Sequence, residues 1–105
     1  MDIDEINLNI DVSITLGLII NELFTNSIKH AFKNRINNTV IISLKKENNT
    51  YQLIVSDNGK GFDFNDISLI KTLGLKLVHI LTQQLKGSLT IKNDNGAKFL
   101  IIFTD

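Results

Sequence analysis

The stretch Asn21-Glu22-Leu23-Phe24-Thr25-Asn26-Ser27-Ile28-Lys29-His30 places polar side chains inside a long apolar segment, and its pattern decides how the chain is interpreted. On a helix of about 3.6 residues per turn, Glu22, Asn26 and Lys29 share one face. The opposite face would carry a stripe of core residues: Leu16, Ile20, Leu23, Ser27 and Ala31. An acid, an amide and a cation in one row, with His30 at the margin, indicate a binding site on a packed helix.

The chain has 105 residues, the size of one domain, and we expect a single domain over residues 1–105. Its 43% of hydrophobic and 21% of charged residues are typical of globular proteins. With 11 basic and 11 acidic residues the formal net charge is zero, which gives no reason to expect a nucleic-acid or membrane-surface partner. The absence of cysteine excludes disulfides, thiolate metal sites and a cysteine nucleophile.

No apolar run is long enough to span a membrane, and the acidic start Met1–Glu5 is unlike a secretory signal. These features predict a cytoplasmic domain without direct membrane contact. Whether a parent protein carries a membrane anchor stays open.

Hydrophobic periodicity predicts the order strand, helix, two strands, loop, helix, two strands. Ile6, Leu8 and Ile10 alternate with asparagines as in a short strand, and Asp11 or Ser13 can cap a helix that continues to about residue 32. The segments that predict two hairpins are 40–44 with 51–56, and 88–92 with 98–103.

The second helix is expected to begin after Thr72 as N-cap and to end at Gly87, in the C′ position. Its apolar stripe consists of Leu73, Leu77, Ile80, Leu81 and Leu85. Neither alternating βαβ units nor a glycine-rich dinucleotide turn is present, which argues against a Rossmann domain. The expected fold class is α+β, a two-layer sandwich with a mixed, mostly antiparallel sheet and helices on one face.

Two further motifs suit a ligand. Asp57-Asn58-Gly59-Lys60-Gly61 follows an apolar strand; it is either a tight turn or a site where Asp57 accepts from a buried ligand that Gly59 and Gly61 let approach. The segment Thr72-Leu73-Gly74-Leu75 opens the second helix, whose first N–H groups form a natural phosphate seat. Every helix has such an end, so this motif is weak alone.

These motifs, in this order, resemble the ATP-binding catalytic domain of sensor histidine kinases, in the Bergerat-type superfamily shared with DNA gyrase, heat-shock chaperone and mismatch-repair ATPases. The resemblance covers about residues 8–103. Residues 18–32 look most like the kinase subgroup whose N box begins Asn-Glu-Leu. The fold it implies is the two-layer sandwich already expected from the pattern.

The resemblance implies Mg-ATP as the ligand, with Asn26 holding Mg²⁺ through its amide oxygen. It implies that Lys29 contacts phosphate and that His30 lies along the ribose or adenine. On the same grounds, Asp57 accepts from the adenine amino group. The glycines Gly59 and Gly61 make room for the base, and the phosphate-side turn consists of Thr72, Gly74 and the Leu75 amide.

Some positions depart from the family's pattern. Gly96-Ala97-Lys98-Phe99 resembles its last glycine box, which more often has Thr at Ala97, so a hydroxyl hydrogen bond is lost there. The segment 62–71 is short for an ATP lid. Glu22 stands where many kinases have Asn; it could act as a base toward the phosphorylated histidine, hold a Mg²⁺-bound water, or orient water as in hydrolytic relatives.

The implied activity is that of a transferase in two-component signalling. The domain would bind Mg-ATP and pass the γ-phosphate to a histidine on a separate domain of the same protein, with a response regulator downstream. That phosphoacceptor domain is not recognised in these residues, because neither His30 nor His79 sits in an acceptor motif. The isolated domain is therefore expected to be a monomer that autophosphorylates little.

Two other functions stay open at this point. One is a stand-alone serine kinase and binding module like the anti-sigma factors, which share the fold. The other is a hydrolase of the gyrase–chaperone type, which Glu22 allows. A sandwich without any ligand is the remaining alternative, and it predicts no binding of ATP with Mg²⁺.

Overall fold

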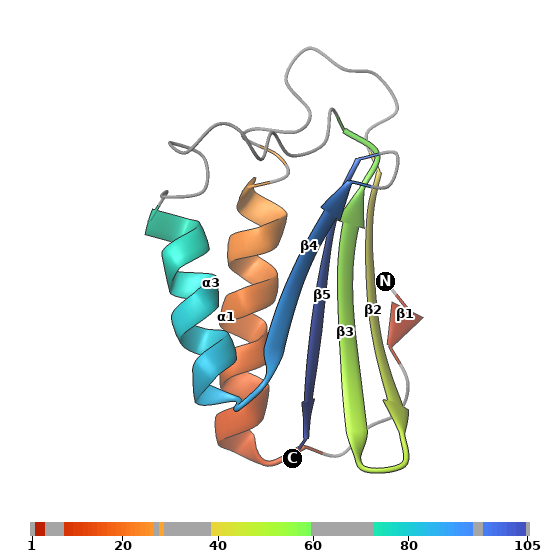
Figure 1. The fold of residues 1–105 in the computed structure, drawn as a ribbon. Coiled ribbons are helices and arrows are strands. Elements are labelled where there is room, and N and C mark those ends of the chain that lie inside the picture. Colours follow the sequence, from red (N-terminus) through yellow and green to blue (C-terminus); the bar gives the residue numbers. More distant parts are fainter. Residues whose placement is uncertain are drawn as a thin grey trace.

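The computed structural model describes residues 2–3, 8–26, 28, 39–59, 73–93 and 96–104. In this described part of the chain, two helices cover one face of a single sheet (Figure 1). The elements are β1 (Asp2–Ile3), α1 (Ile10–Asn26), β2 (Val40–Glu47), β3 (Thr50–Asp57), α3 (Leu73–Gln84), β4 (Ser88–Asn93) and β5 (Ala97–Thr104). Among the described residues, no helix is long and apolar enough to cross a membrane.

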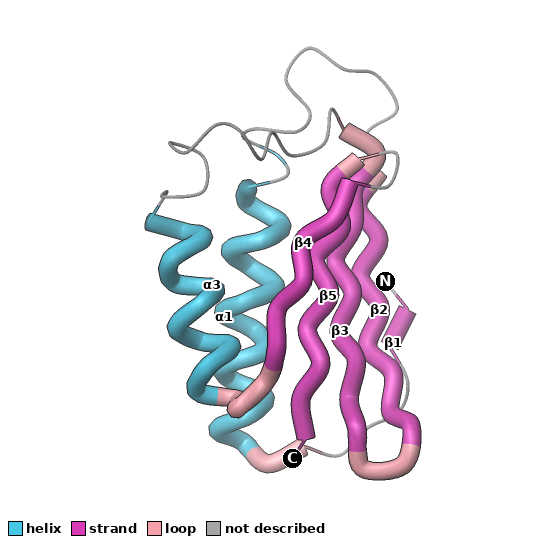
Figure 2. Tube along the Cα trace, in the orientation of Figure 1, coloured by secondary structure: helices cyan, strands magenta, loops and turns pink. Residues whose placement is uncertain are grey.

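The sheet has the strand order β1-β2-β3-β5-β4. Strand β1 pairs with β2 in parallel, and the other neighbours are antiparallel. Figure 2 shows the resulting separation into a helical layer and a strand layer. The predicted α+β sandwich with a mixed, mostly antiparallel sheet is confirmed.

Alternation along β3 and β5 explains how the sheet forms a core. Every second residue of β3 from Tyr51 to Asp57 is buried, and on β5 the buried positions run from Ala97 to Phe103. The register places Leu53 opposite Ile101 and Val55 opposite Phe99, so apolar side chains meet on the covered face. Because of the same alternation, the polar residue Asp57 ends β3 on the buried face.

The start of α1 differs from the prediction. Ile10 is the first residue of the helix and not the end of a strand, and the described strand before it is β1. Asn9 is the N-cap: its Oδ1 accepts from the Val12 N–H at 3.0 Å. The predicted caps Asp11 and Ser13 were therefore wrong. Asparagine side chains satisfy the unpaired N–H groups of a first turn, which explains why Asn9 can end the alternating segment.

The core side of α1 agrees with the prediction at Leu16 and Leu23, which are buried, and at Ile20, which is partly buried. Ile19 is fully buried as well. Of the predicted stripe, Ser27 and Ala31 lie outside the residues whose burial is described, as does the predicted continuation of the helix to residue 32.

Helix α3 begins at Leu73, as expected, but its end differs in detail. Lys86 takes the left-handed conformation, with a φ of 56°. The Gly87 N–H donates to Thr82 O at 3.0 Å and the Lys86 N–H to Gln83 O at 2.9 Å. This is a Schellman motif with Lys86 at C′, so the assignment of C′ to Gly87 was wrong.

Gly87 has a different reason to be glycine. A Cβ built on it would lie 2.7 Å from the carbonyl oxygen of Ile102. The close approach of this residue to β5 therefore excludes a side chain. The apolar stripe of α3 also needs one correction, because Ile80 is 53% exposed while Leu75, Val78, Leu81 and Leu85 are buried.

Candidate functional site

The ends of four elements meet at one end of the molecule. The last turn of α1, the end of β3, the first turn of α3 and the start of β5 all lie at the top of Figure 1. Helices α1 and α3 pack against each other along their lengths. The topology therefore gathers the predicted motifs at one end of the sandwich, although they are far apart in the sequence.

Asp57 is the best-defined polar group at this end. It is 7% exposed, and its Oδ1 accepts from the backbone N–H of Gly59 at 2.9 Å and of Ala97 at 3.0 Å. Hydrogen bonds from N–H groups to a carboxylate are strong and offset the cost of burying it. The Asp57 carboxylate is therefore held in place by the backbone of two different segments.

Gly96 fits directly against Asp57. Its φ is +138°, a conformation that residues with a side chain rarely adopt. A Cβ on Gly96 would come within 2.9 Å of Asp57 Oδ1 and far closer still to the backbone oxygen of Asp57. Glycine is thus required for the approach that brings the Ala97 N–H to the carboxylate.

This contact gives the segment Gly96–Phe99 a role that the sequence did not predict. The prediction was that Ala97 loses a hydroxyl hydrogen bond. In the structure the residue contributes through its backbone N–H instead. A glycine followed by a small residue at the start of the last strand was the available signal, but only the pairing of β3 with β5 shows where the N–H points.

The turn after β3 is tied to the beginning of β2 as well. Asn58 Oδ1 accepts from the Thr39 N–H at 2.9 Å, and the Asn58 N–H donates to Thr39 O at 3.2 Å. Asp57 and Gly59 form a local side-chain-to-backbone turn of the kind that aspartate favours. The two interpretations of this motif, a tight turn and an anchored carboxylate, are therefore compatible.

Helix α1 contributes Glu22 and Asn26, and both residues are partly buried. Within the described part of the chain, Asn26 Nδ2 is a buried side-chain atom that lacks a hydrogen-bond partner. A buried amide left unpaired costs about 1–3 kcal/mol. A bound polar ligand, or a water that accompanies it, could accept a hydrogen bond from this amide.

The remaining predicted site residues are only partly described. Gly74 lies in the first turn of α3, and the Leu75 side chain is buried in the core at 5% exposure. Lys29, His30, Gly61 and Thr72 lie outside the described residues, as does the short lid segment 62–71. Their assignments stay predictions.

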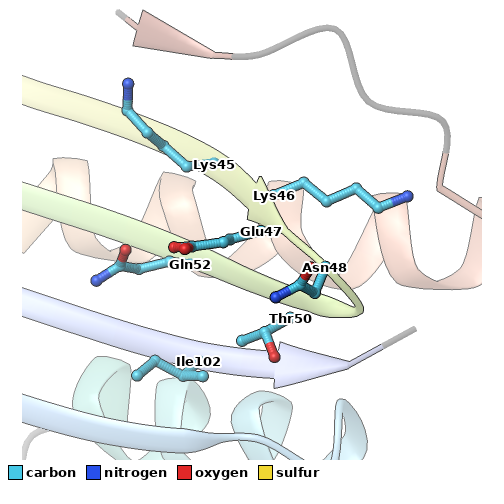
Figure 3. A pocket seen from close by; sticks show the side chains of 7 residues that line it. All are labelled: Lys45, Lys46, Glu47, Asn48, Thr50, Gln52 and Ile102. Carbon is cyan, nitrogen blue, oxygen red and sulfur yellow. The ribbon is translucent and has the colours of Figure 1, made fainter.

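A separate pocket of about 490 Å³ lies at the other end of β3 from Asp57, beside the β2–β3 hairpin (Figure 3). The side chains that line it are Lys45, Lys46, Glu47, Asn48, Thr50, Gln52 and Ile102. Most of them are exposed surface residues. In the described segments, no cluster of acidic, histidine or cysteine side chains could hold a metal ion there or elsewhere.

Comparison with known protein families agrees with this arrangement. The family described as histidine kinase-, DNA gyrase B-, and HSP90-like ATPase matches residues 11–105, so the chain belongs to this family of ATPases. Members of the family bind ATP, and the residues at the top of the sandwich suit such a ligand: an anchored acceptor, close glycine backbone and an unpaired amide. Among curated protein sequences, none matches the chain.

Several solved structures with a similar fold come from histidine kinases. The histidine kinase domain of the blue-light activated histidine kinase EL346 from Erythrobacter litoralis has a TM-score of 0.88 at 24% identity, and the match covers 98% of this chain and 49% of that one. The Acinetobacter baumannii histidine kinase AdeS has a TM-score of 0.71 at 24% identity, with 86% and 45% covered.

The ATP-binding domain of PrrB from Mycobacterium tuberculosis has a TM-score of 0.71 at 22% identity, with 87% of this chain and 67% of that one covered. At these identities the likenesses show the fold, which is the ATP-binding fold of histidine kinases. The chain spans about half the length of the EL346 kinase domain.

Proposed function

We propose that this chain is the Mg-ATP-binding catalytic domain of a two-component sensor histidine kinase, which delivers the γ-phosphate to a histidine on a separate domain. The observation that carries the proposal is the buried Asp57 carboxylate, fixed by the Gly59 and Ala97 N–H groups. Membership of the ATPase family supports ATP as the ligand, and the likeness to histidine kinase structures favours a kinase.

The base end of the site would be Asp57. A carboxylate only accepts hydrogen bonds, so it suits the amino group of adenine and opposes the carbonyl of guanine at the same ring position. Its two backbone donors keep the carboxylate from rotating away. Gly59 and Gly61 would leave room for the base. Preference for ATP over GTP then follows from a fixed acceptor that meets a donor in one base and an acceptor in the other.

The phosphate end would be the last turn of α1 and the first turn of α3. Asn26 would hold Mg²⁺ through its amide oxygen, and the buried Nδ2 that lacks a partner supports a polar ligand beside it. Lys29, His30, Thr72, Gly74 and the Leu75 amide would contact the nucleotide. When bound, Mg²⁺ neutralises charge on the phosphates; the protein's own contribution is to position them.

Glu22 would act beside the phosphates, one helical turn before Asn26. It would either take the proton from the acceptor histidine as that histidine attacks the γ-phosphate, or hold a water on the metal. A hydrolytic function remains the second candidate, because an acid at this position could instead orient water for attack. The side chain is partly exposed, as either role requires.

The surrounding assignments belong to the same proposal. The Asn21-Glu22-Leu23 sequence supports assignment to the kinase subgroup whose N box begins Asn-Glu-Leu. The phosphoacceptor histidine domain of the same protein and a response regulator are its partners, the compartment is the cytoplasm, and the isolated domain is a monomer.

ATP turnover by the isolated domain tests the kinase assignment. We expect binding of ATP that is lost when Mg²⁺ is chelated, with little release of phosphate. The wild type should be compared with Glu22→Gln at saturating ATP. Substantial hydrolysis that the Glu22→Gln change abolishes would show a hydrolase of the gyrase–chaperone type instead.

A further inference from the structure

The outer face of α1 carries large apolar side chains that the described part of the domain leaves exposed. Ile10 is 74% exposed, Ile14 57%, Leu18 48% and Phe24 41%. Ile28, the described residue just past the end of the helix, is 54% exposed. The core side chains of α1, Leu16, Ile19 and Leu23, lie on the opposite side of the helix. Helix α1 therefore has a second apolar face beyond the one that packs in the core.

The spacing of this face is that of a helix-packing seam. Ile10, Ile14, Gly17, Asn21 and Phe24 follow one another at intervals of four, three, four and three residues, and Leu18 lies beside them. Alternating steps of four and three residues are the heptad pattern by which one helix packs on another. Within α1 itself nothing needs this pattern, because the core uses the other side.

Gly17 and Asn21, the small and the polar residue of the seam, also suit packing against a second helix. A Cβ built on Gly17 would meet no atom within 4 Å, so the fold does not require glycine there, although glycine disfavours helix. It leaves a gap between Ile14 and Asn21 that a side chain of a facing helix can fill. A single asparagine in an apolar seam, such as Asn21, fixes the register of a partner helix.

The size of the face argues against a second copy of this chain as the occupant. The exposed surface of its four large side chains, Ile10, Ile14, Leu18 and Phe24, amounts to roughly 400 Å². A stable dimer buries about 800 Å² on each partner. The charges of α1 also argue against a second copy, because its only charged side chains are the acids Asp11 and Glu22. A second α1 would add acids and no base.

We propose that this face, formed by Ile10, Ile14, Gly17, Leu18, Asn21 and Phe24, docks one amphipathic helix of a partner, with an apolar heptad stripe flanked by Lys or Arg. A basic flank complements Asp11, which follows Ile10 directly and lies at the end of α1 away from Asn26. The face points away from the side of α1 that carries Asn26, so the proposal is independent of nucleotide binding.

A peptide titration tests it. The probe is a synthetic peptide of three heptads with Ile and Leu in the seam and Lys on both flanks; a matched peptide has Glu in place of Lys. Binding is followed by NMR on ¹⁵N-labelled protein. The Lys peptide should shift amides of residues 10–28, and Ile14→Glu should weaken its binding about tenfold or more.

Ile80→Glu is the matched control, because Ile80 on α3 is 53% exposed and lies outside the seam. It should leave the affinity unchanged, and circular dichroism should show both variants folded. The proposal is overturned if the Lys peptide does not bind, if the shifts map elsewhere, or if both variants weaken binding equally. Equal binding of the Glu peptide, or a dimer in sedimentation that Ile14→Glu dissociates, also overturns it.

Discussion

The backbone N–H of Ala97 donates a 3.0 Å hydrogen bond to the carboxylate of Asp57, 40 residues earlier in the chain. The bond joins the first residue of β5 to the last residue of β3. Because these strands are neighbours in the sheet, the position of the carboxylate depends on how the chain enters β5. The conformation of Gly96 therefore bears directly on the site.

Gly96→Ala is expected to lower both stability and nucleotide affinity. An added Cβ collides with Asp57, and a side chain at φ +138° is strained by about 1–3 kcal/mol. The carboxylate must shift, so ATP affinity should fall about tenfold or more. Urea unfolding and calorimetric titration with Mg-ATP measure the two effects. Unchanged affinity in a folded Gly96→Ala protein would contradict the role assigned to this contact.

Gly17→Ala is the complementary glycine change and is expected to stabilise the domain. The added methyl meets nothing within 4 Å, and alanine favours helix over glycine by about 1 kcal/mol. The midpoint of urea unfolding should rise while ATP affinity stays at the wild-type value. A loss of stability would show that Gly17 is needed by the fold itself, contrary to its exposed position.

The end of α3 offers a third test. Lys86 holds a left-handed conformation at φ 56°, which costs a residue with a side chain roughly 1 kcal/mol. Lys86→Gly should therefore raise the free energy of unfolding by about that amount. Lys76→Gly, an exposed change within the same helix, should lower it by about 1 kcal/mol. The two variants remove the same side chain, and equal effects in urea unfolding would disprove the Schellman assignment.

Asn26→Leu should separate stability from binding. The buried Nδ2 has no partner among the described residues, so replacing the amide by an apolar group of similar size removes an unsatisfied donor that costs about 1–3 kcal/mol. Thermal unfolding should show equal or higher stability, while Mg-ATP binding is lost. A variant that binds Mg-ATP as tightly as the wild type contradicts Asn26 as the metal ligand, and one that is markedly less stable contradicts the unsatisfied Nδ2.

Periodicity predicted the layers of this fold well, because helices and strands of a two-layer sandwich each have one buried side. The runs around Val55 and Ile101 alternate strictly, and Leu16 and Leu23 follow the helical period. The start of α1 was missed because Ile6, Leu8 and Ile10 alternate like a strand, while the capping bond of Asn9 decides where the helix begins.

The site was harder to predict where it depends on long-range register. Asp57 at the end of a strand was visible in the sequence, but the donation from Ala97 arises only when β5 pairs with β3. The need for glycine at positions 87 and 96 likewise comes from contacts with Ile102 and Asp57. Ile80 was assigned to the core from its spacing, but its side chain is 53% exposed.

The most direct test of the account is the nucleotide affinity of Asp57→Asn. Asparagine keeps an oxygen that can accept from the Gly59 and Ala97 N–H groups, and it replaces the other oxygen by a donor. Calorimetric titration should show that the wild type binds ATP with Mg²⁺ and binds GTP at least about tenfold more weakly, and that folded Asp57→Asn loses ATP affinity by about two orders of magnitude. Equal ATP affinity in the wild type and in Asp57→Asn would contradict the central claim.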